Sequence, residues 1–162
     1  MLNGKQEFDQ VKVRDDELVE LDKLKKLSCR YPVKSGAENS SGKTNILLQS
    51  YISNNARVSS FTLISDTNYV AQNASRVTRA LFEICLKKGW AIAAEKMLAV
   101  AKSIDQRIWW HQTPLRQFNT LPVDSLYKLE ENSIDVFKLF TLSASEIGNI
   151  VGNPHSGDKV KY

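Results

Sequence analysis

Residues 65–89 carry the sequence signals of one long amphipathic helix: typical start and end residues, an apolar side and a polar side. It opens with Ser65 and Asp66, whose side chains accept hydrogen bonds from the free N–H groups at a helix start. It closes with two lysines, which suit the negative end of the helix dipole, and with Gly89, a residue type that commonly follows a helix. At about 100° per residue the apolar residues gather on one side, which must pack against other helices. They are Val70, Ala74, Val77, Leu81, Ile84 and Cys85.

The opposite side of this segment is polar and carries Asn68, Tyr69, Gln72, Arg76, Arg79, Glu83 and Lys87. Such a side is commonly a solvated helix face. It also suits contact with a nucleic-acid strand, because arginine and glutamine hydrogen-bond phosphates and base edges, and tyrosine stacks on bases. Helical periodicity is the same in both cases and does not choose between them.

The composition is that of an ordinary globular chain with a mild excess of positive charge. Its 162 residues suffice for one domain, or for a helical domain with a small appendage. The net charge of +4 permits contact with nucleic acid without requiring it. Cys29 and Cys85 are typical of reduced thiols in a cytosolic or nuclear protein. No apolar run approaches the ~20 residues that span a bilayer, and the first ten residues lack the apolar core of a signal peptide. We therefore expect a nuclear or cytoplasmic location and no membrane partner.

The spacing of apolar residues predicts an all-α fold, a multi-helix bundle followed by a small helix-loop-helix subdomain. Residues 1–14 are expected to connect from an upstream domain, with Phe8, Val11 and Val13 as anchors. The bundle is expected over residues 15–118, the helix-loop-helix over residues 119–151, and a connector to a downstream domain over residues 152–162. The helices are predicted from Asp15, at 44–53, 65–89 and 90–110, and then at 123–131, 134–140 and 143–151.

Residues 37–44 (AENSSGKT) end in the GKT of a phosphate-binding loop, with a small residue at the matching distance upstream. A working loop of that kind follows a buried β-strand and needs an acidic residue on a second strand for Mg²⁺. The preceding residues (CRYPVKSG) do not form such a strand pattern, and no acidic run ends a hydrophobic strand elsewhere. We therefore expect residues 42–44 to be a loop and helix start with a structural role.

We find no pattern for catalysis, metal binding or cofactor binding within the chain. His111 and His155 lie in expected loops and form no zinc pattern with the two cysteines. No nucleophile elbow, paired carboxylates or Ser/His/Asp spacing is detectable. The apolar stripe that begins at Trp90 is typical of a core rather than of a cofactor site.

Residues 121–151 resemble a helix-hairpin-helix or helix-loop-helix unit. In the versions that bind nucleic acid, backbone N–H groups at a glycine-containing hairpin hold a phosphate. Here the expected turns fall at residues 132–133 and 142–143, while Gly148 lies inside the expected last helix. This placement favours packing over phosphate binding.

Four further strings point to one family. They are ENSSGKTNILLQSYIS (38–53), SFTLISDTNYVAQNASRVTRALFEICLKKGW (60–90), IDQRIW (104–109) and PLRQF (114–118). Together they resemble the Sec-sixty-three homology region of large, Ski-two-like DExH-box helicases, and the ending LEENSIDVFKLFTLSASEIGNIV resembles that region's helix-loop-helix. The resemblance covers about residues 7–162.

The resemblance implies that the chain is an accessory module without a motor of its own. In that family two RecA-like domains and a winged helix precede this region, and an immunoglobulin-like domain follows it. ATP and Mg²⁺ belong to the motor domains, so the parent protein would be an ATP hydrolase while this region holds no cofactor. The implied partners are single-stranded RNA or DNA and those neighbouring domains.

The resemblance also assigns a role to the segment at residues 65–89. The family's bundle carries a so-called ratchet helix, which crosses the single strand as it leaves the motor. By resemblance, Asn73 and Arg76 in QNASR are the first choices for strand contact, and the helical side adds Gln72, Arg79 and Tyr69.

Two other functions compete with this interpretation. A related region occurs in an endoplasmic-reticulum translocation factor, where it is a protein-interaction scaffold, and an independent NTPase would need a strand before the GKT string. A strand-binding module should keep the side bearing Gln72, Arg76 and Arg79 open and electropositive. A scaffold should have it covered by Glu83, Asp105 or another helix.

Overall fold

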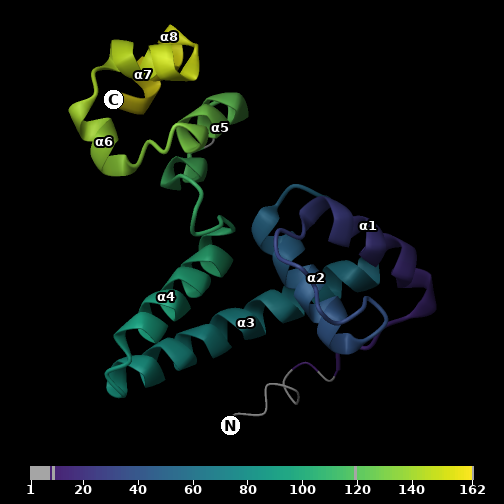
Figure 1. Ribbon diagram of the computed structural model, residues 1–162. Coiled ribbons are helices and arrows are strands. Elements are labelled where there is room, and N and C mark those ends of the chain that lie inside the picture. The colour runs from purple at the N-terminus through teal and green to yellow at the C-terminus, as the bar shows by residue number, and fades with distance from the viewer. Residues whose placement is uncertain (1–7, 9, 119, 162) are drawn as a thin grey trace. The chain divides into compact units, whose positions relative to one another are not determined.

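The computed structural model describes residues 8, 10–118 and 120–161, and all regular structure within these residues is helical (Figure 1). The predicted all-α class is therefore confirmed. The chain forms two compact units, residues 1–110 and residues 111–162, and each is described by itself.

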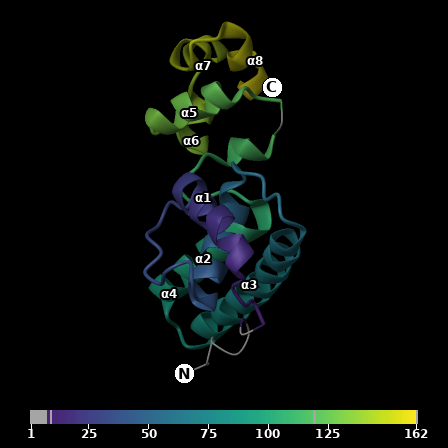
Figure 2. The same ribbon diagram turned by 90° about the vertical axis from the view of Figure 1, so that its right-hand side faces the viewer.

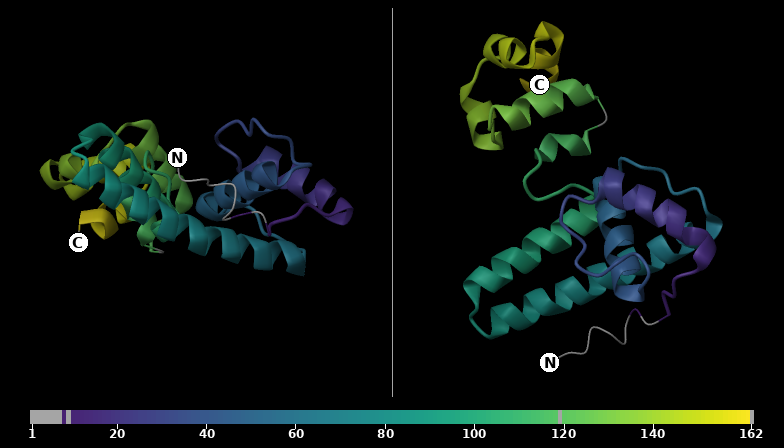
Figure 3. Two further views of the ribbon diagram at one scale, coloured as in Figure 1. Left: turned by 90° about the horizontal axis from the view of Figure 1, so that it is seen from below. Right: turned by 45° about the vertical axis from the view of Figure 1, so that its right-hand side comes forward.

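Among the residues that the structure describes, the first unit contains four α-helices preceded by a 3₁₀ turn: Asp15–Glu17, α1 (Leu18–Ser28), α2 (Ser40–Ser53), α3 (Phe61–Lys87) and α4 (Ala91–Gln106). The long helix α3 is central to this unit, because both α2 and α4 pack against it. Helix α4 packs antiparallel along α3, and α2 packs on the first half of α3 and on α1 (Figures 1 and 3). One core cluster joins α1, α2 and α3 through Leu21, Leu24, Ile46, Leu47, Leu63 and Val70. A second joins α2, α3 and α4 through Ile52, Ala74, Ile104 and Trp109.

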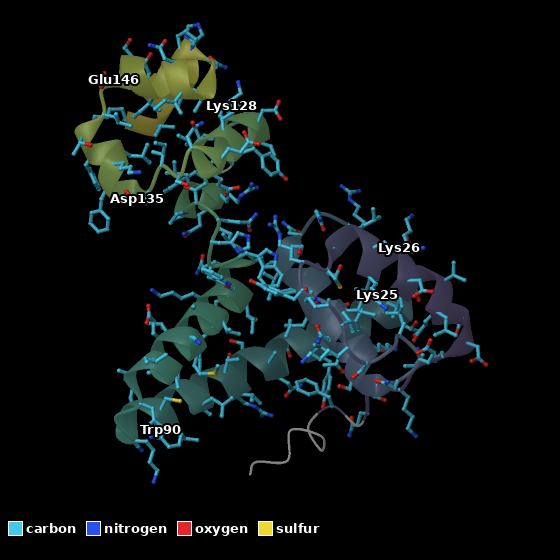
Figure 4. All side chains as sticks on the ribbon, viewed as in Figure 1. Lys25, Lys26, Trp90, Lys128, Asp135 and Glu146 are labelled. Atoms are coloured by element: carbon cyan, nitrogen blue, oxygen red, sulfur yellow. The ribbon has the colours of Figure 1, made fainter. Side chains whose placement is uncertain are left out.

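The predicted end of α3 is confirmed in detail. Gly89 adopts the left-handed conformation (φ 68°), and the N–H of Trp90 donates to the carbonyl of Cys85 at 2.9 Å. This is the Schellman arrangement, which pairs the last carbonyls of a helix. The prediction that Trp90 lies in the core is wrong, because its side chain follows the turn, lies at the tip of the α3–α4 hairpin and is 57% exposed (Figure 4).

Helix α3 begins at Phe61, four residues before the predicted start. Asp66, one of the two residues expected to cap it, instead accepts a hydrogen bond from Lys43 at 2.6 Å. Glu20 of α1 accepts hydrogen bonds from the backbone N–H groups of Ser59 and Ser60 just before the first turn. A tertiary contact therefore sets the start of the helix.

Helix α2 also begins early, at Ser40, because Asn39 caps it by accepting a hydrogen bond from the N–H of Gly42 at 2.8 Å. Gly42 cannot carry a side chain here, since a Cβ would lie 1.8 Å from the carbonyl oxygen of Gly36. The GKT string is therefore the first turn of a helix pressed against the preceding loop.

Over its described residues, 111–118 and 120–161, the second unit contains a 3₁₀ turn and four short helices: Pro114–Gln117, α5 (Val123–Glu131), α6 (Val136–Thr141), α7 (Ala144–Val151) and α8 (Pro154–Lys161). Leu129, Leu139, Ile147 and Val151 form its core, and Leu142 and Ile150 pack against it. Residues 111–118, which the sequence places in the bundle, belong to this unit. Leu115 packs on its core, and Arg116 makes two hydrogen bonds to Glu130, at 2.7 and 2.8 Å.

Helix α8 lies where the sequence predicts an irregular connector. Pro154 at its first position has a suitable fixed φ, and the side chain of Asn153 accepts a hydrogen bond from the N–H of His155 at 3.1 Å. The helix packs closely on α7 (Figure 2), and a Cβ at Gly157 would lie 2.1 Å from the carbonyl oxygen of Ala144. Gly157 therefore permits a close crossing of the two helices.

Candidate nucleic-acid interface

The five residues predicted to contact a strand lie along one side of α3. Tyr69, Gln72, Arg76 and Arg79 are exposed, and Asn73 is half-buried. The helix places them there because its apolar residues Val70, Ala71 and Ala74, on the other side, are buried in the bundle. At 1.5 Å per residue the row spans about 15 Å. We call these five residues the α3 polar face.

Within the α3 polar face, Asn73 links Tyr69 to Arg76. The Nδ2 of Asn73 donates to the carbonyl oxygen of Tyr69 at 2.9 Å, and its Oδ1 accepts a hydrogen bond from Nη2 of Arg76 at 3.0 Å. The amide of Asn73 thereby helps to orient the guanidinium of Arg76. Asn73 thus connects Tyr69 and Arg76, a contact that the helical spacing alone did not reveal.

Arg79 is engaged by the neighbouring helix. Its Nη2 donates to Oδ2 of Asp105 on α4 at 2.5 Å, and the Oγ of Ser75 donates to the other carboxylate oxygen at 2.7 Å. These hydrogen bonds, that from Arg79 first, lower the pKa of Asp105 below its ordinary value, and the same contact raises the pKa of Arg79. Both side chains remain partly open to solvent, at 66% for Arg79 and 29% for Asp105.

A groove of about 600 Å³ runs beside the α3 polar face. Gln72, Ser75 and Arg79 line it from α3, and Ile104 and Asp105 line it from α4, with Tyr51 contributed by α2. The ion pair between Arg79 and Asp105 therefore lies within the groove.

From the sequence, this side of α3 is expected to be exposed in a strand-binding module and covered in a scaffold. The structure has features of both. Gln72 and Arg76 are exposed to solvent, as a strand-binding module requires. Arg79 is met by Asp105, as a scaffold would have it. The α3 polar face thus exposes side-chain donors along its length, and the cation of Arg79 is shared with a carboxylate.

The lysine of the GKT string has a structural position. Its side chain is fully buried, and its Nζ donates to the Lys12 carbonyl at 2.8 Å, to Glu17 at 2.5 Å and to Asp66 at 2.6 Å. Glu17 is also buried and accepts a further hydrogen bond from Thr62 at 2.8 Å. Lys43 therefore joins the N-terminal segment, α2 and α3, the structural role that the sequence favoured.

No group of three or more His, Cys, Asp or Glu side chains suited to a metal ion occurs among the residues that the structure describes. Over the same residues, no helix is long and apolar enough to cross a membrane.

Comparison with known proteins places the chain in a family. The profile of the Sec63 Brl domain matches residues 1–155. The chain is a Sec63 Brl domain. The prediction from the sequence strings is confirmed at this level.

The proteins that are similar to this Sec63 Brl domain are much longer than this chain. Activating signal cointegrator 1 complex subunit 3 is 50% identical over 156 residues in Bos taurus and 49% identical in Homo sapiens, over 96% of this chain and 7% of each relative. The DExH-box ATP-dependent RNA helicase DExH14 of Arabidopsis thaliana is 41% identical over 162 residues, 99% of this chain and 8% of that protein. The chain thus corresponds to less than a tenth of the relatives it matches, and these include ATP-dependent helicases.

Three residues of this Sec63 Brl domain beside α3 lay outside the predicted set: Tyr51 and Asn68 line the groove, and Arg107 lines a neighbouring hollow. Tyr51, Asn68 and Arg107 come from three different helices or their ends. Asn68 was on the polar side of the helical projection, and this was its only signal. Tyr51 and Arg107 come into contact because α2 packs against α4. Residue spacing within a single helix does not predict such a contact between helices.

Proposed function

We propose that this Sec63 Brl domain is an accessory module that guides single-stranded nucleic acid in a large ATP-dependent RNA or DNA helicase. The observation that carries the proposal is the α3 polar face, where exposed Gln72 and Arg76 recur at helical spacing and Asn73 orients the arginine. Planar donors on a rigid helix suit phosphates and base edges.

The mechanism is steric and electrostatic. The α3 polar face grips the strand backbone between ATP-driven steps, so that the strand resists sliding backwards while the motor supplies the work. A helix of this kind makes few phosphate contacts, so binding by this chain alone is weak and strongly dependent on salt. ATP and Mg²⁺ act in RecA-like domains of the parent protein, which with a winged-helix and an immunoglobulin-like domain are the proposed neighbours. The nucleus and the cytoplasm are the proposed locations.

The alternative is a protein-interaction scaffold related to the endoplasmic-reticulum translocation factor. The observation that favours it is the ion pair of Arg79 with Asp105, which removes one cation from the open row. In a scaffold the α3 polar face would serve packing against a protein, and changes there would affect assembly before they affected any strand.

The complete helicase provides the test. Arg76→Ala should reduce strand unwinding much more than ATP hydrolysis, because the grip is separate from the motor. Lys26→Ala is the matched control, since Lys26 is an exposed cation on α1 that lines neither groove beside α3 (Figure 4). Equal loss of unwinding and hydrolysis in a folded Arg76→Ala protein would overturn the proposal, and loss of complex assembly alone would favour the scaffold.

A further inference from the structure

The groove beside the α3 polar face continues into a second hollow. This hollow, of about 290 Å³, shares Tyr51 and Asn68 with the first and extends toward the C-terminal ends of α2 and α4. Arg57 and Arg107 are among the residues that line it. A linear ligand that lies along α3 can therefore pass Asn68 and enter it.

Arg107 is held as a flat surface in this hollow. It follows α4 in the left-handed conformation (φ 55°), and its guanidinium carbon lies 4.6 Å from the centroid of the Tyr51 ring. Its Nε donates to the Tyr51 carbonyl at 3.0 Å, and its Nη2 donates to Oδ1 of Asn54 at 2.6 Å. Both acceptors are neutral, so these contacts fix the orientation of the guanidinium and leave its positive charge in place.

The chemistry of the hollow suits an anionic ligand that has a planar group. Among the described side chains that line it, two are arginines, two are the amides of Asn54 and Asn68, and none is acidic. Arg57 is exposed and has no acidic partner within the part of the chain that the structure describes. Guanidinium planes stack on nucleobases, and arginine pairs with phosphate. The groove beside the α3 polar face differs in charge, because the acidic Asp105 lines it.

We infer that the second hollow is a nucleotide subsite for the same single strand, an inference that rests on the proposed function. One base stacks on the guanidinium of Arg107, which the Tyr51 ring supports from below. Arg57 pairs with an adjacent phosphate, and Asn68 lies where the strand passes from the α3 polar face into the hollow. The ligand class is a single-stranded nucleic acid, with stacking rather than base-edge recognition at this position.

The test is a titration of this chain with fluorescent single-stranded oligonucleotides at low salt. Arg57→Glu should weaken binding about tenfold, because it replaces a phosphate partner with a like charge. The matched control Lys26→Glu changes the same charge on exposed α1 and should have little effect. Arg107→Lys keeps the charge but loses the plane, and should weaken binding about fivefold or more, the factor for one base stack.

A crosslink makes the test independent of variant stability. An oligonucleotide with one 5-iodouridine, irradiated on the unchanged chain, should attach to a peptide that contains Tyr51, Arg57 or Arg107. Loss of affinity on Arg76→Ala, with none on Arg57→Glu or Arg107→Lys and no such crosslink, would overturn this inference alone. No binding by the unchanged chain would overturn the proposed function and this inference together.

Discussion

The guanidinium of Arg79 on α3 lies 2.5 Å from the carboxylate of Asp105 on α4, and Ser75 donates to the second oxygen of that carboxylate. The pair lies in the groove beside the α3 polar face. Asp105 therefore shares the charge of Arg79 inside this groove. On the proposed function, the strand competes with Asp105 for Arg79.

Asp105→Asn should therefore tighten binding to single-stranded nucleic acid. The change keeps the shape of the side chain and removes the charge that competes with phosphate. If Arg79 then contacts one phosphate, the slope of log K against log salt should steepen by about one. Fluorescence titrations at several salt concentrations measure this. Asp22→Asn removes an exposed charge on α1 and is the control. Equal effects of the two changes would show that Arg79 is not released to the strand.

Lys43→Met should destabilise the first unit strongly. The change leaves Glu17 and Asp66 without their shared cation, and loss of one partner from a buried ion pair costs about 3–5 kcal/mol. Urea unfolding monitored by circular dichroism gives the free energy of unfolding, and failure to obtain folded protein points the same way. Lys26→Met, on exposed α1, should cost less than about 0.5 kcal/mol. Similar costs for the two would contradict the structural role of Lys43.

The same buried centre predicts a dependence of stability on acid pH. Burial by itself raises the pKa of Glu17, but hydrogen bonds from Lys43 and Thr62 and the charge of Lys43 together lower it below its ordinary 4.5. A carboxylate with a lowered pKa in the folded state contributes stability above its unfolded pKa and loses it as the pH falls through the folded value. The free energy of unfolding should therefore decrease as the pH falls below 4.5.

Glu17→Gln identifies the group responsible for that decrease. The variant should be less stable at neutral pH, and its stability should change less over the acid range, because one linked carboxylate is gone. Urea unfolding at a series of pH values compares the two proteins. An identical pH dependence in both would assign the acid sensitivity to other carboxylates.

Gly157→Ala should loosen α8 from α7. A Cβ at this position would lie 2.1 Å from the Ala144 carbonyl oxygen and 2.8 Å from the Gly148 nitrogen, both of which are backbone atoms. Overpacking of this kind costs about 1–3 kcal/mol. Hydrogen exchange of the α7 and α8 amides should become faster in this variant. The neighbouring Asp158→Ala, at an exposed position, should leave the exchange unchanged. Equal exchange rates in the two variants would contradict this prediction, because they would show that the α7–α8 contact accommodates the added methyl group without loss of stability.

The sequence predicts helices and sides of helices well where the signal is local. The Gly89 turn and most of the apolar side of α3 follow from residues within one helix: Val70, Ala74 and Cys85 are buried as predicted, whereas Ile84 is 39% exposed. The start of α3 was misplaced because Asp66 bonds to Lys43, a residue 23 positions away. Helix α8 was missed because it depends on a tertiary contact with α7, where Gly157 allows a close approach to Ala144.

In the candidate site, too, features set within one helix are predicted from the sequence, and features set by contacts between helices are not. Helical spacing identifies Gln72, Arg76 and Arg79 as neighbours on one side, because that depends only on the period of the helix. It does not determine which of them meets Asp105. That contact depends on the register of α4 against α3, which the turn at Gly89 and the packing around Ala74 and Ile104 establish together.

The central claim is that the α3 polar face binds single-stranded nucleic acid. The most direct measurement is a titration of fluorescent single-stranded RNA and DNA with this chain and with Arg76→Ala, at about 50 mM and about 200 mM salt. We predict weak binding by the unchanged chain that falls steeply with salt and is largely lost in Arg76→Ala. Binding that is the same in Arg76→Ala and in Lys26→Ala, or no binding at the lower salt, would contradict the account.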